Sequence, residues 1–436
     1  MRSKFFGGVH PAERKELSAG RTPTPAPAPA QVIIPMAQHI GATCTPLVKA
    51  GDLVAMGQKI GDGPGLCVPV HASVSGRVAA VEPRPHVTGR QVLSVVIDND
   101  YQDTPARELV PHPNPDSISA EEIVSIIREA GIVGMGGATF PTDVKANTGI
   151  GKVDTLIANA CECEPYVTAD DALLCTHAEN VLLGMELMRR VLEPRRTVLG
   201  IEDNKPDAIA ALTKCLLQHP GIELAVLPTR YPQGAEKQLI QSITGREVPG
   251  GQLPASVGCA VFNVATCASV YEAVYKGRPI TRRIVTITGE GIKTPMNLIV
   301  RVGTPFENVV AAAGGLTDDI WKVISGGAMM GVAQKDLQAP VIKGTTGILC
   351  LTHKQNGDVA HPTCIRCARC VAACPMKLQP LYLYRFEKKG DLDQLRKLNA
   401  MDCIECGCCA HLCPGKLPLV EVIRSAKQQL KEASAK

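Results

Sequence analysis

The stretch CIRCARCVAACP, Cys364 to Pro375, returns in the same chain as CIECGCCAHLCP, Cys403 to Pro414. In both copies three cysteines are separated by two residues each, and a fourth cysteine follows directly before a proline. Three thiolates at this spacing wrap one corner of a cubane cluster, and the fourth reaches a neighbouring cluster. Zinc sites do not carry this doubled run of four cysteines. The repeat therefore predicts a ferredoxin-like, α-helical domain with two [4Fe–4S] clusters.

The position of each cysteine in the repeat predicts its cluster, because the fourth thiolate of each run belongs to the other cluster. The first cluster is expected on Cys364, Cys367, Cys370 and Cys413. The second cluster is expected on Cys403, Cys406, Cys409 and Cys374. Cys408 belongs to neither pattern and is expected to be a bystander thiol. Two such clusters carry single electrons and do no organic chemistry, so the electron source must lie upstream.

The composition limits the classes of protein to which the chain can belong. It has 436 residues, a net charge of +4, 45% apolar residues and only 3% aromatic residues. This length fits several domains, and the near-neutral charge argues against a nucleic-acid binder. We find no apolar run long enough to span a membrane and no signal-peptide pattern. With 18 cysteines, a cytoplasmic location favours reduced or metal-bound thiols.

Composition shifts divide the chain into five parts. Residues 1–30 form an arm that ends in the Pro-rich linker TPTPAPAPA, and residues 31–104 read as short strands with Gly turns. Residues 117–280 alternate strands with helices, which are expected near 119–130, 178–191 and 206–218, and this alternation indicates a parallel α/β sheet. Residues 281–352 are β-rich around a helix at 305–313, and residues 354–436 hold the cysteine repeat.

A glycine-rich loop, GIVGMGGATFPT, runs from Gly131 to Thr142. Glycine backbone approaches a planar ring or a phosphate closely, although such a loop is also typical of a simple tight turn. It is not the dinucleotide fingerprint G-x-G-x-x-G, because Thr139 stands at the third glycine position. Lys145 follows at a spacing suited to a cation near an anionic group, or to a solvated surface lysine.

The strand VDTLIANA leads through Asn159 into CECEPY, Cys161 to Tyr166, with Asp170 beyond. Ligands of open α/β sheets bind at the carboxyl ends of the strands, so these residues are placed to face a cofactor. Cys161 and Cys163 lack nearby partners at metal-type spacing and are expected to be reduced thiols. Glu162 and Glu164 are either a solvated rim or acceptors for a flavin or ribose.

Several motifs together resemble one known family. They are FGGVHPAERKEL, GIVGMGGATFPTDVK, NACECEPYVTAD, YPQGAEKQLIQSITGREVP, NVATCASVYEAV, ISGGAMMG and the doubled cysteine run. They are similar to the RnfC family of Rnf-type ion-translocating ferredoxin:NAD oxidoreductases, which is related to the flavin- and NADH-binding subunit of respiratory complex I. The resemblance implies a barrel-sandwich hybrid (31–104), a Rossmann-like FMN and NADH domain (117–280), a β-grasp SLBB domain (281–352) and a two-[4Fe–4S] domain (354–436).

The resemblance also implies roles for individual residues. Those expected to hold FMN are Gly134, Gly136, Gly137, Lys145, Asn159, Glu162, Cys163, Asn263 and Thr266. Those expected to contact NADH are Phe140, Glu164 and Glu236. The chain departs from the complex I pattern in reading CECEP and in carrying Ala235 where that group has a glutamate.

The activity implied by the resemblance is electron transfer linked to NAD(H). Hydride passes between NAD(H) and non-covalent FMN, and single electrons pass through two [4Fe–4S] clusters to or from partner subunits, with no side chain acting as acid or base. Ferredoxin:NAD oxidoreduction is thereby coupled to Na+ or H+ transport. The implied partners are membrane-embedded and ferredoxin-type iron–sulfur subunits, with no nucleic acid. The implied place is the cytoplasmic side of a bacterial or archaeal membrane, reached through partners only.

The segment VKAGDLVAMGQ, Val48 to Gln58, looks like a biotinyl or lipoyl carrier motif. No lysine stands between Lys59 and Lys145, so no swinging arm has a place of attachment. The block is therefore expected to dock a partner or to be structural.

Three other readings compete. A cobalamin reductase of B12-dependent diol metabolism shares the flavin and cluster modules, but its flavin domain comes first in the chain. A non-catalytic, ferredoxin-like electron carrier predicts clusters without flavin. A structural assembly protein predicts no redox activity, which fits poorly with eight regularly spaced cysteines.

Overall fold

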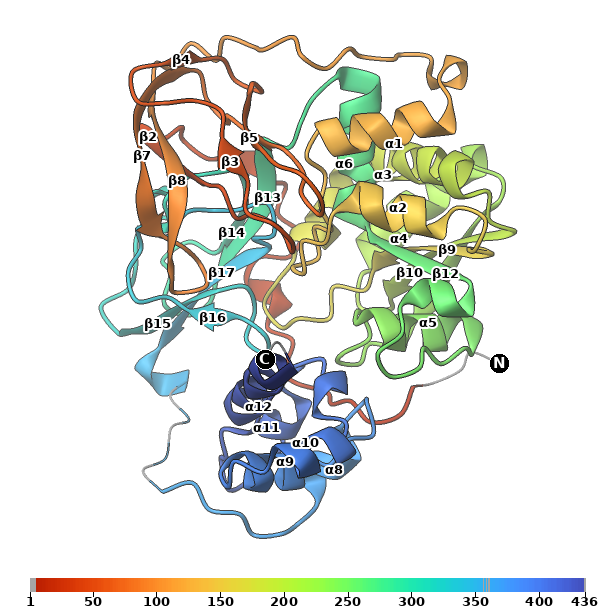
Figure 1. Cartoon of the computed structure of the whole chain (residues 1–436), viewed down its shortest axis with the longest axis vertical. Coiled ribbons are helices and arrows are strands. Elements are labelled where there is room, and N and C mark those ends of the chain that lie inside the picture. The colour runs from red at the N-terminus through yellow and green to blue at the C-terminus, as the bar shows by residue number, and fades with distance from the viewer. Residues whose placement is uncertain (1–4, 356, 358, 360, 435–436) are drawn as a thin grey trace.

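The computed structural model describes residues 5–355, 357, 359 and 361–434. Four folded units are visible in Figure 1. Two β-rich units lie on one side, an α/β unit lies beside them, and a small helical unit at the C-terminus lies below both. Within the described residues no helix combines the length and apolar character needed to cross a bilayer.

The first β-rich unit consists of two small sheets with strand orders β2-β8-β7-β4 and β3-β5-β6. The strands are β2 (Gln31–Pro35), β3 (Thr45–Pro46), β4 (Leu53–Val54), β5 (Lys59–Asp62), β6 (Val70–His71), β7 (Gly76–Pro85) and β8 (Gln91–Asn99). Val32 and Ile34 of β2 are fully buried in the core of this unit, together with Ile60 and Ile97. Ile33 points to the opposite face of the strand and is buried there as well, so β2 is covered on both faces.

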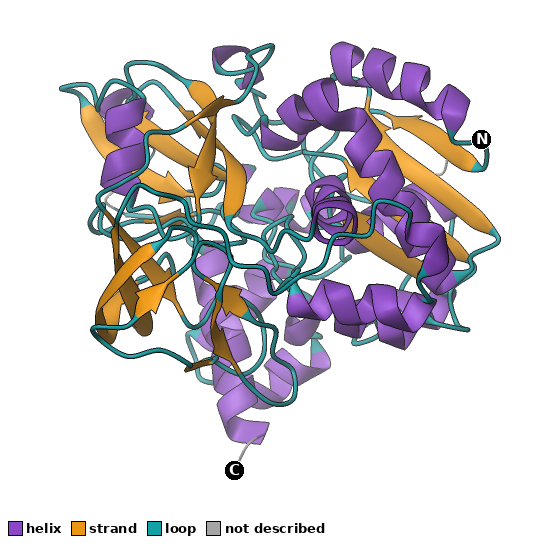
Figure 2. Cartoon of the chain, turned by 90° about the horizontal axis from the view of Figure 1, so that it is seen from above, coloured by secondary structure: helices purple, strands orange, loops and turns teal. Residues whose placement is uncertain are grey.

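The α/β unit is a parallel sheet in the order β11-β10-β9-β12. Its strands are β9 (Thr155–Ala160), β10 (Arg196–Glu202), β11 (Ile222–Leu227) and β12 (Cys259–Asn263), and its helices are α1 (Ala120–Glu129), α2 (Thr142–Gly149), α3 (Ala169–Leu192), α4 (Pro206–Cys215), α5 (Glu236–Thr244) and α6 (Val264–Lys276). Helices cover both faces (Figure 2), which explains why β9 and β10 are almost wholly buried. All four strands point the same way, so their carboxyl ends meet at one edge.

One helix of this unit differs from the sequence-based expectation. The helix expected at 178–191 is the second part of α3, which begins earlier, at Ala169. Non-helical dihedral angles at His177 (φ −140°, ψ 36°) separate the two parts. The early start is stabilised by the Glu162 carboxylate, which accepts the N–H of Asp170 in the first turn.

The second β-rich unit is a six-stranded sheet in the order β1-β14-β13-β17-β15-β16, packed on one helix. Its elements are β1 (Thr24–Pro25), β13 (Arg282–Thr288), β14 (Met296–Arg301), α7 (Phe306–Ala312), β15 (Ile320–Ser325), β16 (Val332–Ala333) and β17 (Gly347–Thr352). The Pro-rich stretch expected to be a linker contributes β1, which pairs in parallel with Leu298 and Ile299. Proline is compatible with this place because β1 lies at an edge of the sheet.

The C-terminal unit is helical and consists of α8 (Arg369–Ala373), α9 (Pro380–Glu387), α10 (Leu392–Lys397), α11 (Cys408–His411) and α12 (Leu419–Ser434). Leu383, Leu395 and Ile423 form its buried core. Short 3-10 helices complete the chain at Lys15–Leu17, Pro115–Ser117, Leu216–Gln218, Pro254–Val257, His353–Gln355 and Ala400–Asp402.

The N-terminal arm fastens the helical unit to the α/β unit. The N–H of Gly8 donates to the carbonyl of Ala373 over 2.9 Å, and Val9 pairs with Tyr231. Gly7 has φ +71°, and a Cβ there would lie 2.7 Å from the carbonyl carbon of Cys374. The close approach of the arm to the first cysteine run therefore requires glycine.

Candidate cofactor sites

The carboxyl ends of the parallel strands bring three sequence-distant segments together. Asn159 at the end of β9 donates from its side-chain nitrogen to the carbonyl of Gly234 over 2.8 Å. Its side-chain oxygen accepts the N–H of Cys161 at 3.0 Å. Asn263 ends the neighbouring strand β12 and caps α6 by accepting the N–H of Ala265 at 2.9 Å. The polar edge predicted from the sequence is thus assembled from β9, β12 and the segment after β11.

The glycine-rich loop lies over this edge. Within the loop the N–H of Gly134 donates to the carbonyl of Phe140 (2.8 Å), and the Thr266 hydroxyl accepts the N–H of Met135 (2.9 Å). A Cβ on Gly136 would lie 3.6 Å from the side-chain nitrogen of Asn263. Gly137 is exposed, has φ +106°, and a Cβ there would meet nothing within 4 Å. The loop therefore presents bare backbone next to Asn263, as a planar or phosphorylated ligand requires.

Two carboxylates stand at the start of α3, below the loop. Glu162 accepts the N–H groups of Asp170 (2.8 Å) and Asp171 (3.4 Å), and Asp170 accepts from the Asn263 side chain at 2.6 Å. Burial, followed by the charge of Glu162, raises the pKa of Asp170 to about 7. The sequence places Asp170, the last residue of the motif NACECEPYVTAD, among the residues expected to face a cofactor, without assigning it a contact.

Arg283, the second residue of β13, reaches the same loop from the neighbouring unit. It is only 3% exposed, and its Nη2 donates to the carbonyl of Met135 over 3.0 Å. Its Nε and Nη1 have no hydrogen-bond partner among the described residues. Burial lowers the pKa of Arg283 to about 10. Buried, unpaired guanidinium donors beside bare loop backbone fit an anionic nucleotide such as FMN.

Lys145 on α2 is engaged within the protein. Its Nζ lies 2.5 Å from the Glu236 carboxylate and 2.9 Å from the carbonyl of Val261, and it stands 5.6 Å from the centre of the Phe262 ring. Glu236 is the first residue of α5, so this ion pair joins α2 to α5. The structure thereby places two of the predicted site residues in direct contact.

Cys163 and Glu164 have different neighbours. The Cys163 sulfur accepts the N–H of Gly234 at 3.3 Å. The Glu164 carboxylate accepts the N–H of Met329 (3.1 Å) and the phenol of Tyr231 (3.4 Å). Burial raises the pKa of Glu164 to about 7. Glu164 is therefore bonded toward the β-rich and helical units, whereas Glu236 is paired with Lys145.

The eight cysteines of the repeat line two separate cavities in the helical unit. One cavity is lined by Cys364, Cys367, Cys370 and Cys413. The other is lined by Cys374, Cys403, Cys406 and Cys409, and also by Cys408. The fourth cysteine of each run lies with the first three of the other run, which is the arrangement expected for two crossed four-iron sites.

The backbone around the two cavities repeats as the sequence does. Arg366 and Glu405, with φ 56° and 58°, donate their N–H groups to the sulfurs of Cys364 and Cys403 at 3.3 and 3.4 Å. In the same way, N–H groups four residues further along donate to the fourth cysteines: Leu378 to Cys374 (3.4 Å) and Leu417 to Cys413 (3.5 Å). Such donors stabilise negative charge on thiolate sulfur and tune cluster potentials.

The two cavities differ in their exposure. Cys364 and Cys367 are exposed, whereas Cys374, Cys406 and Cys409 are buried. The buried cavity faces the α/β unit, because the phenol of Tyr231 donates to the carbonyl of Cys406 over 2.7 Å. The thiols of the first site are thus nearer the solvent, and the second site lies on the side of the helical unit that contacts the α/β unit.

Comparison with known proteins decides the family. The chain is 48% identical over 429 residues to the RnfC-type component of the Na+-translocating ferredoxin:NAD+ oxidoreductase complex of Acetobacterium woodii, covering 98% of this chain and 97% of that protein. It is 44% identical to the proton-translocating counterpart of Clostridium ljungdahlii, covering 99% and 95%. The chain belongs to the RnfC family.

The domain families of this RnfC chain follow in the predicted order. They are the RnfC barrel-sandwich hybrid domain at 3–102, the Nuo51 FMN-binding domain at 127–272, the SLBB domain at 284–333 and the 4Fe-4S dicluster domain at 363–416. An NAD+-reducing [NiFe]-hydrogenase has a similar fold, with TM-score 0.51 and 20% identity over 74% of this chain and 65% of that one. The predicted fold class, the family and the cofactor types, FMN and [4Fe–4S] clusters, are confirmed.

Two residues that the structure places at these sites were not predicted from the sequence. Arg283 comes from a different domain. Tyr231 stands in the quoted motif YPQGAEKQ, but its contact with the carbonyl of Cys406 spans two domains. The sequence gives only a weak signal for such contacts. That signal is a polar residue at a position within a strand or motif whose other residues are buried.

Proposed function

We propose that this chain is the NAD(H)-linked electron-transfer subunit of an ion-translocating ferredoxin:NAD+ oxidoreductase complex. The observation that carries the proposal is the contact of Tyr231 with Cys406. Through it, the enclosed four-cysteine cavity lies against the same sheet edge that bears the flavin-type loop. When bound, FMN exchanges a hydride with a pyridine nucleotide and exchanges single electrons with the iron–sulfur clusters.

The residues proposed to hold FMN bind and orient it and take no part in proton transfer. The backbone of Gly134, Gly136 and Gly137 gives a flat ring or phosphate close approach, and Asn159 and Asn263 supply amide groups at the strand ends. Thr266 fixes the loop through Met135. Lys145, Glu162 and Cys163 complete the predicted set, and we add Asp170 and Arg283 to it. The two unpaired donors of Arg283 support an anionic ligand.

The residues proposed for NADH are Phe140, Glu164 and Glu236. The half-buried Phe140 follows the exposed part of the glycine loop, where an aromatic ring can stack on a base or nicotinamide. The ion pair with Lys145 balances the charge of Glu236 and supports a role for its carboxylate as an acceptor of ribose hydroxyls. The contacts of Glu164 with Met329 and Tyr231 support a role closer to the enclosed cluster site.

We propose that Cys364, Cys367, Cys370 and Cys413 ligate one [4Fe–4S] cluster, and that Cys403, Cys406, Cys409 and Cys374 ligate the other. The grouping of these thiols around two cavities supports the assignment. Because Cys364 and Cys367 are exposed, this is the site that a partner protein can approach. The buried set is shielded from solvent and faces the flavin-type edge.

The relatives belong to complexes that are named as Na+-translocating and proton-translocating. We propose that this chain likewise binds membrane-embedded and ferredoxin-type subunits at the cytoplasmic face, as a peripheral member. The coupling ion is either Na+ or H+.

The test is anaerobic purification of the full chain, with iron, flavin and NADH:viologen reductase activity measured on one sample. About eight iron atoms, as two four-iron clusters require, one FMN per chain and NADH-dependent viologen reduction are expected. Iron without flavin, and no reduction by NADH after FMN is added, would overturn the proposal in favour of a simple electron carrier.

A further inference from the structure

Three side chains outside the cofactor sites converge in the barrel-sandwich unit. His39 follows β2, Cys44 precedes β3, and Cys67 lies in the loop between β5 and β6. The two sulfurs are 3.3 Å apart, and the Nε2 atom of His39 lies 3.7 Å from each of them. Both cysteines are 2% exposed, and His39 is half-buried. Two thiols and one imidazole are a typical zinc ligand set.

The separations match those of ligands around one zinc ion. Tetrahedral bonds of about 2.3 Å to sulfur and about 2.0–2.1 Å to nitrogen place two sulfurs about 3.8 Å apart, and sulfur about 3.6 Å from nitrogen. The observed sulfur–nitrogen distances of 3.7 Å agree with this geometry to about 0.1 Å, and the sulfur–sulfur distance of 3.3 Å is about 0.5 Å shorter, so the two thiols must separate slightly on binding. A disulfide would instead bring the two sulfurs within about 2.05 Å of each other, and it does not account for an imidazole at equal distance from both sulfurs. We propose that His39, Cys44 and Cys67 bind a single Zn2+ ion.

The imidazole is held in the orientation that the metal requires. Nδ1 of His39 lies 3.3 Å from the carbonyl oxygen of Ile40, to which it donates when it carries the ring proton. The lone pair of Nε2 then faces the two sulfurs and the N–H of Val68, which donates to it over 3.3 Å, and zinc binding exchanges this hydrogen bond for a bond to the metal. Metal-binding histidines are commonly fixed in this way, through a hydrogen bond from the second ring nitrogen to a carbonyl. Because His39 is half-buried, water can reach the fourth coordination position.

The loops that carry the ligands are joined before any metal binds. The N–H of Ala42 donates to the carbonyl of Leu66 (2.9 Å), and that of Cys44 donates to the carbonyl of Met36 (3.1 Å). Gly41 has φ +126°, and a Cβ there would lie 2.1 Å from the carbonyl oxygen of Leu66. Glycine at position 41 therefore allows the two loops to contact each other. The loops are already in place, so zinc binding requires little further ordering of the backbone.

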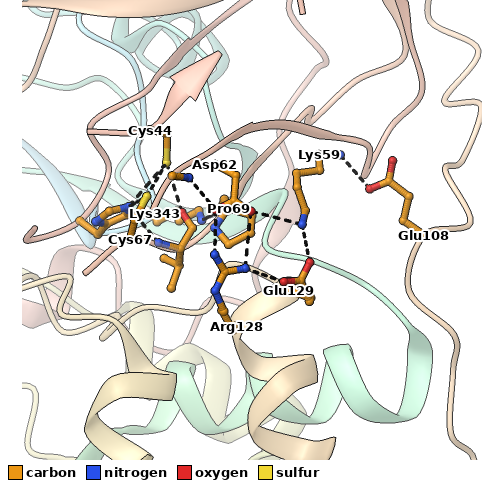
Figure 3. Close-up of polar contacts among 12 residues, drawn as sticks. Cys44, Lys59, Asp62, Cys67, Pro69, Glu108, Arg128, Glu129 and Lys343 are labelled. Carbon is orange, nitrogen blue, oxygen red and sulfur yellow. Dashed lines mark hydrogen bonds and ion pairs between the residues drawn. The ribbon is translucent and has the colours of Figure 1, made fainter. Parts of the chain in front are cut away.

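A buried lysine lies beside the two cysteines (Figure 3). Lys343 is fully buried, and its Nζ donates to the carbonyls of Pro69 and Gly131 at 2.7 Å each. Its side chain lies beside Cys44 and Cys67, so it adds one positive charge next to the proposed ligands. Two thiolates formed on metal binding neutralise one Zn2+ ion.

The site also lies beside the glycine-rich loop. The N–H of Ile40, next to His39, donates to the carbonyl of Thr139 over 3.2 Å, and Lys343 holds the carbonyl of Gly131 at the start of that loop. We therefore assign the ion a structural role, which fixes the surface on which the loop rests. The cysteine spacing in the sequence does not reveal this site, because Cys67 comes from a different loop.

The experiment is metal analysis of the anaerobically purified, cluster-loaded full chain. About one zinc per chain is expected beside about eight iron atoms, and Cys67→Ser and Cys44→Ser should each lower zinc at least five-fold with iron unchanged. Cys350→Ser is the matched control, since Cys350 is a fully buried free thiol on β17, outside the cysteine repeat. It should keep both metals.

A second measurement needs no variant. X-ray absorption at the zinc edge of the parent protein should give two sulfurs at about 2.3 Å and at least one nitrogen at about 2.0–2.1 Å. A coordination shell of four sulfurs would mean that zinc occupies a vacant cluster site, and it would overturn the proposal. The absence of zinc, a different metal that depends on Cys67, or a Cys44–Cys67 disulfide in peptide mapping would overturn it as well.

Discussion

Tyr231 and Cys406 are joined by a hydrogen bond of 2.7 Å from the phenol to the main-chain carbonyl. Tyr231 is 2% exposed, and its own N–H and carbonyl pair with Val9 of the N-terminal arm. The side chain of Tyr231 thus holds the second cysteine run against the edge of the α/β sheet. The backbone of the same residue fixes the N-terminal arm, which contacts both units. The distance between the flavin-type edge and the enclosed cavity depends on this contact.

Tyr231→Phe should therefore loosen the helical unit without removing any proposed ligand. The carbonyl of Cys406 loses its buried donor, which costs about 1–3 kcal/mol. We expect a lower thermal midpoint under anaerobic conditions, with iron and flavin contents unchanged at low temperature.

Tyr382→Phe is the control for this change, because Tyr382 lies in the same unit and is 46% exposed. Its effect should stay within about 0.5 kcal/mol. Equal midpoints for the two variants would show that the phenol of Tyr231 contributes nothing to the attachment.

The crossed pairing of the cysteines makes a prediction that single substitutions cannot test. Removing Cys364 and Cys413 together should abolish one cluster only and leave about four iron atoms per chain, because both thiols line the same cavity. Removing Cys364 and Cys374 together should destroy both clusters, since these two thiols line different cavities. Iron analysis of the two double serine variants, purified anaerobically, provides the measurement.

Cys408→Ser is the matched control, since Cys408 lies within the second run and lines its cavity. It should retain about eight iron atoms, the content of two four-iron clusters. The opposite result for the double variants, with one cluster left only when Cys364 and Cys374 are removed, would mean that each run ligates its own cluster.

Features with strong local signals were predictable from the sequence. The cysteine repeat specifies its own spacing, and the alternation of strands and helices between 117 and 280 reflects a periodic burial pattern that each segment carries by itself. The edge position of Asn159 was also predictable, because parallel strands place their carboxyl ends together.

Features that depend on tertiary contacts were not predictable. Pro25 reads as part of a linker, and it is an edge strand only because β14 offers an unpaired partner. Arg283 reads as an ordinary strand residue, and its role follows from the packing of β13 against the glycine-rich loop. The same applies to His39, Cys44 and Cys67, which no spacing rule joins.

Lys145→Met tests the flavin-type site. The variant keeps the length of the side chain but removes the charge that pairs with Glu236 and contacts the carbonyl of Val261 on β12. We expect at least a ten-fold weaker retention of FMN during gel filtration, with iron unchanged. The reason is that an anionic ligand loses a cation and is left beside an unpaired carboxylate.

Lys152→Met serves for comparison, because Lys152 follows the same helix and is exposed. It should bind FMN as the parent does. Full flavin retention in Lys145→Met would remove Lys145 from the proposed set.

His71 predicts how stability changes with pH. It is 2% exposed on β6, and its Nδ1 has no hydrogen-bond partner among the described residues. Burial, followed by the positive charges of Lys343 and Lys59, lowers the pKa of His71 well below its usual value of 6.5. Below pH 6.5 the unfolded chain therefore binds a proton that the folded chain does not, so the free energy of unfolding falls as the pH falls.

At about pH 5.5 the loss attributable to His71 is about 1.4 kcal/mol relative to a pH well above the usual histidine pKa. His71→Gln removes the titrating group, so the difference between its urea midpoints at about pH 7.5 and about pH 5.5 should be smaller than that of the parent. His10→Gln changes an exposed histidine and should leave the parental difference intact. If His71→Gln lost as much stability on acidification as the parent does, the acid sensitivity would have to reside in other groups, and His71 would be protonated inside the fold.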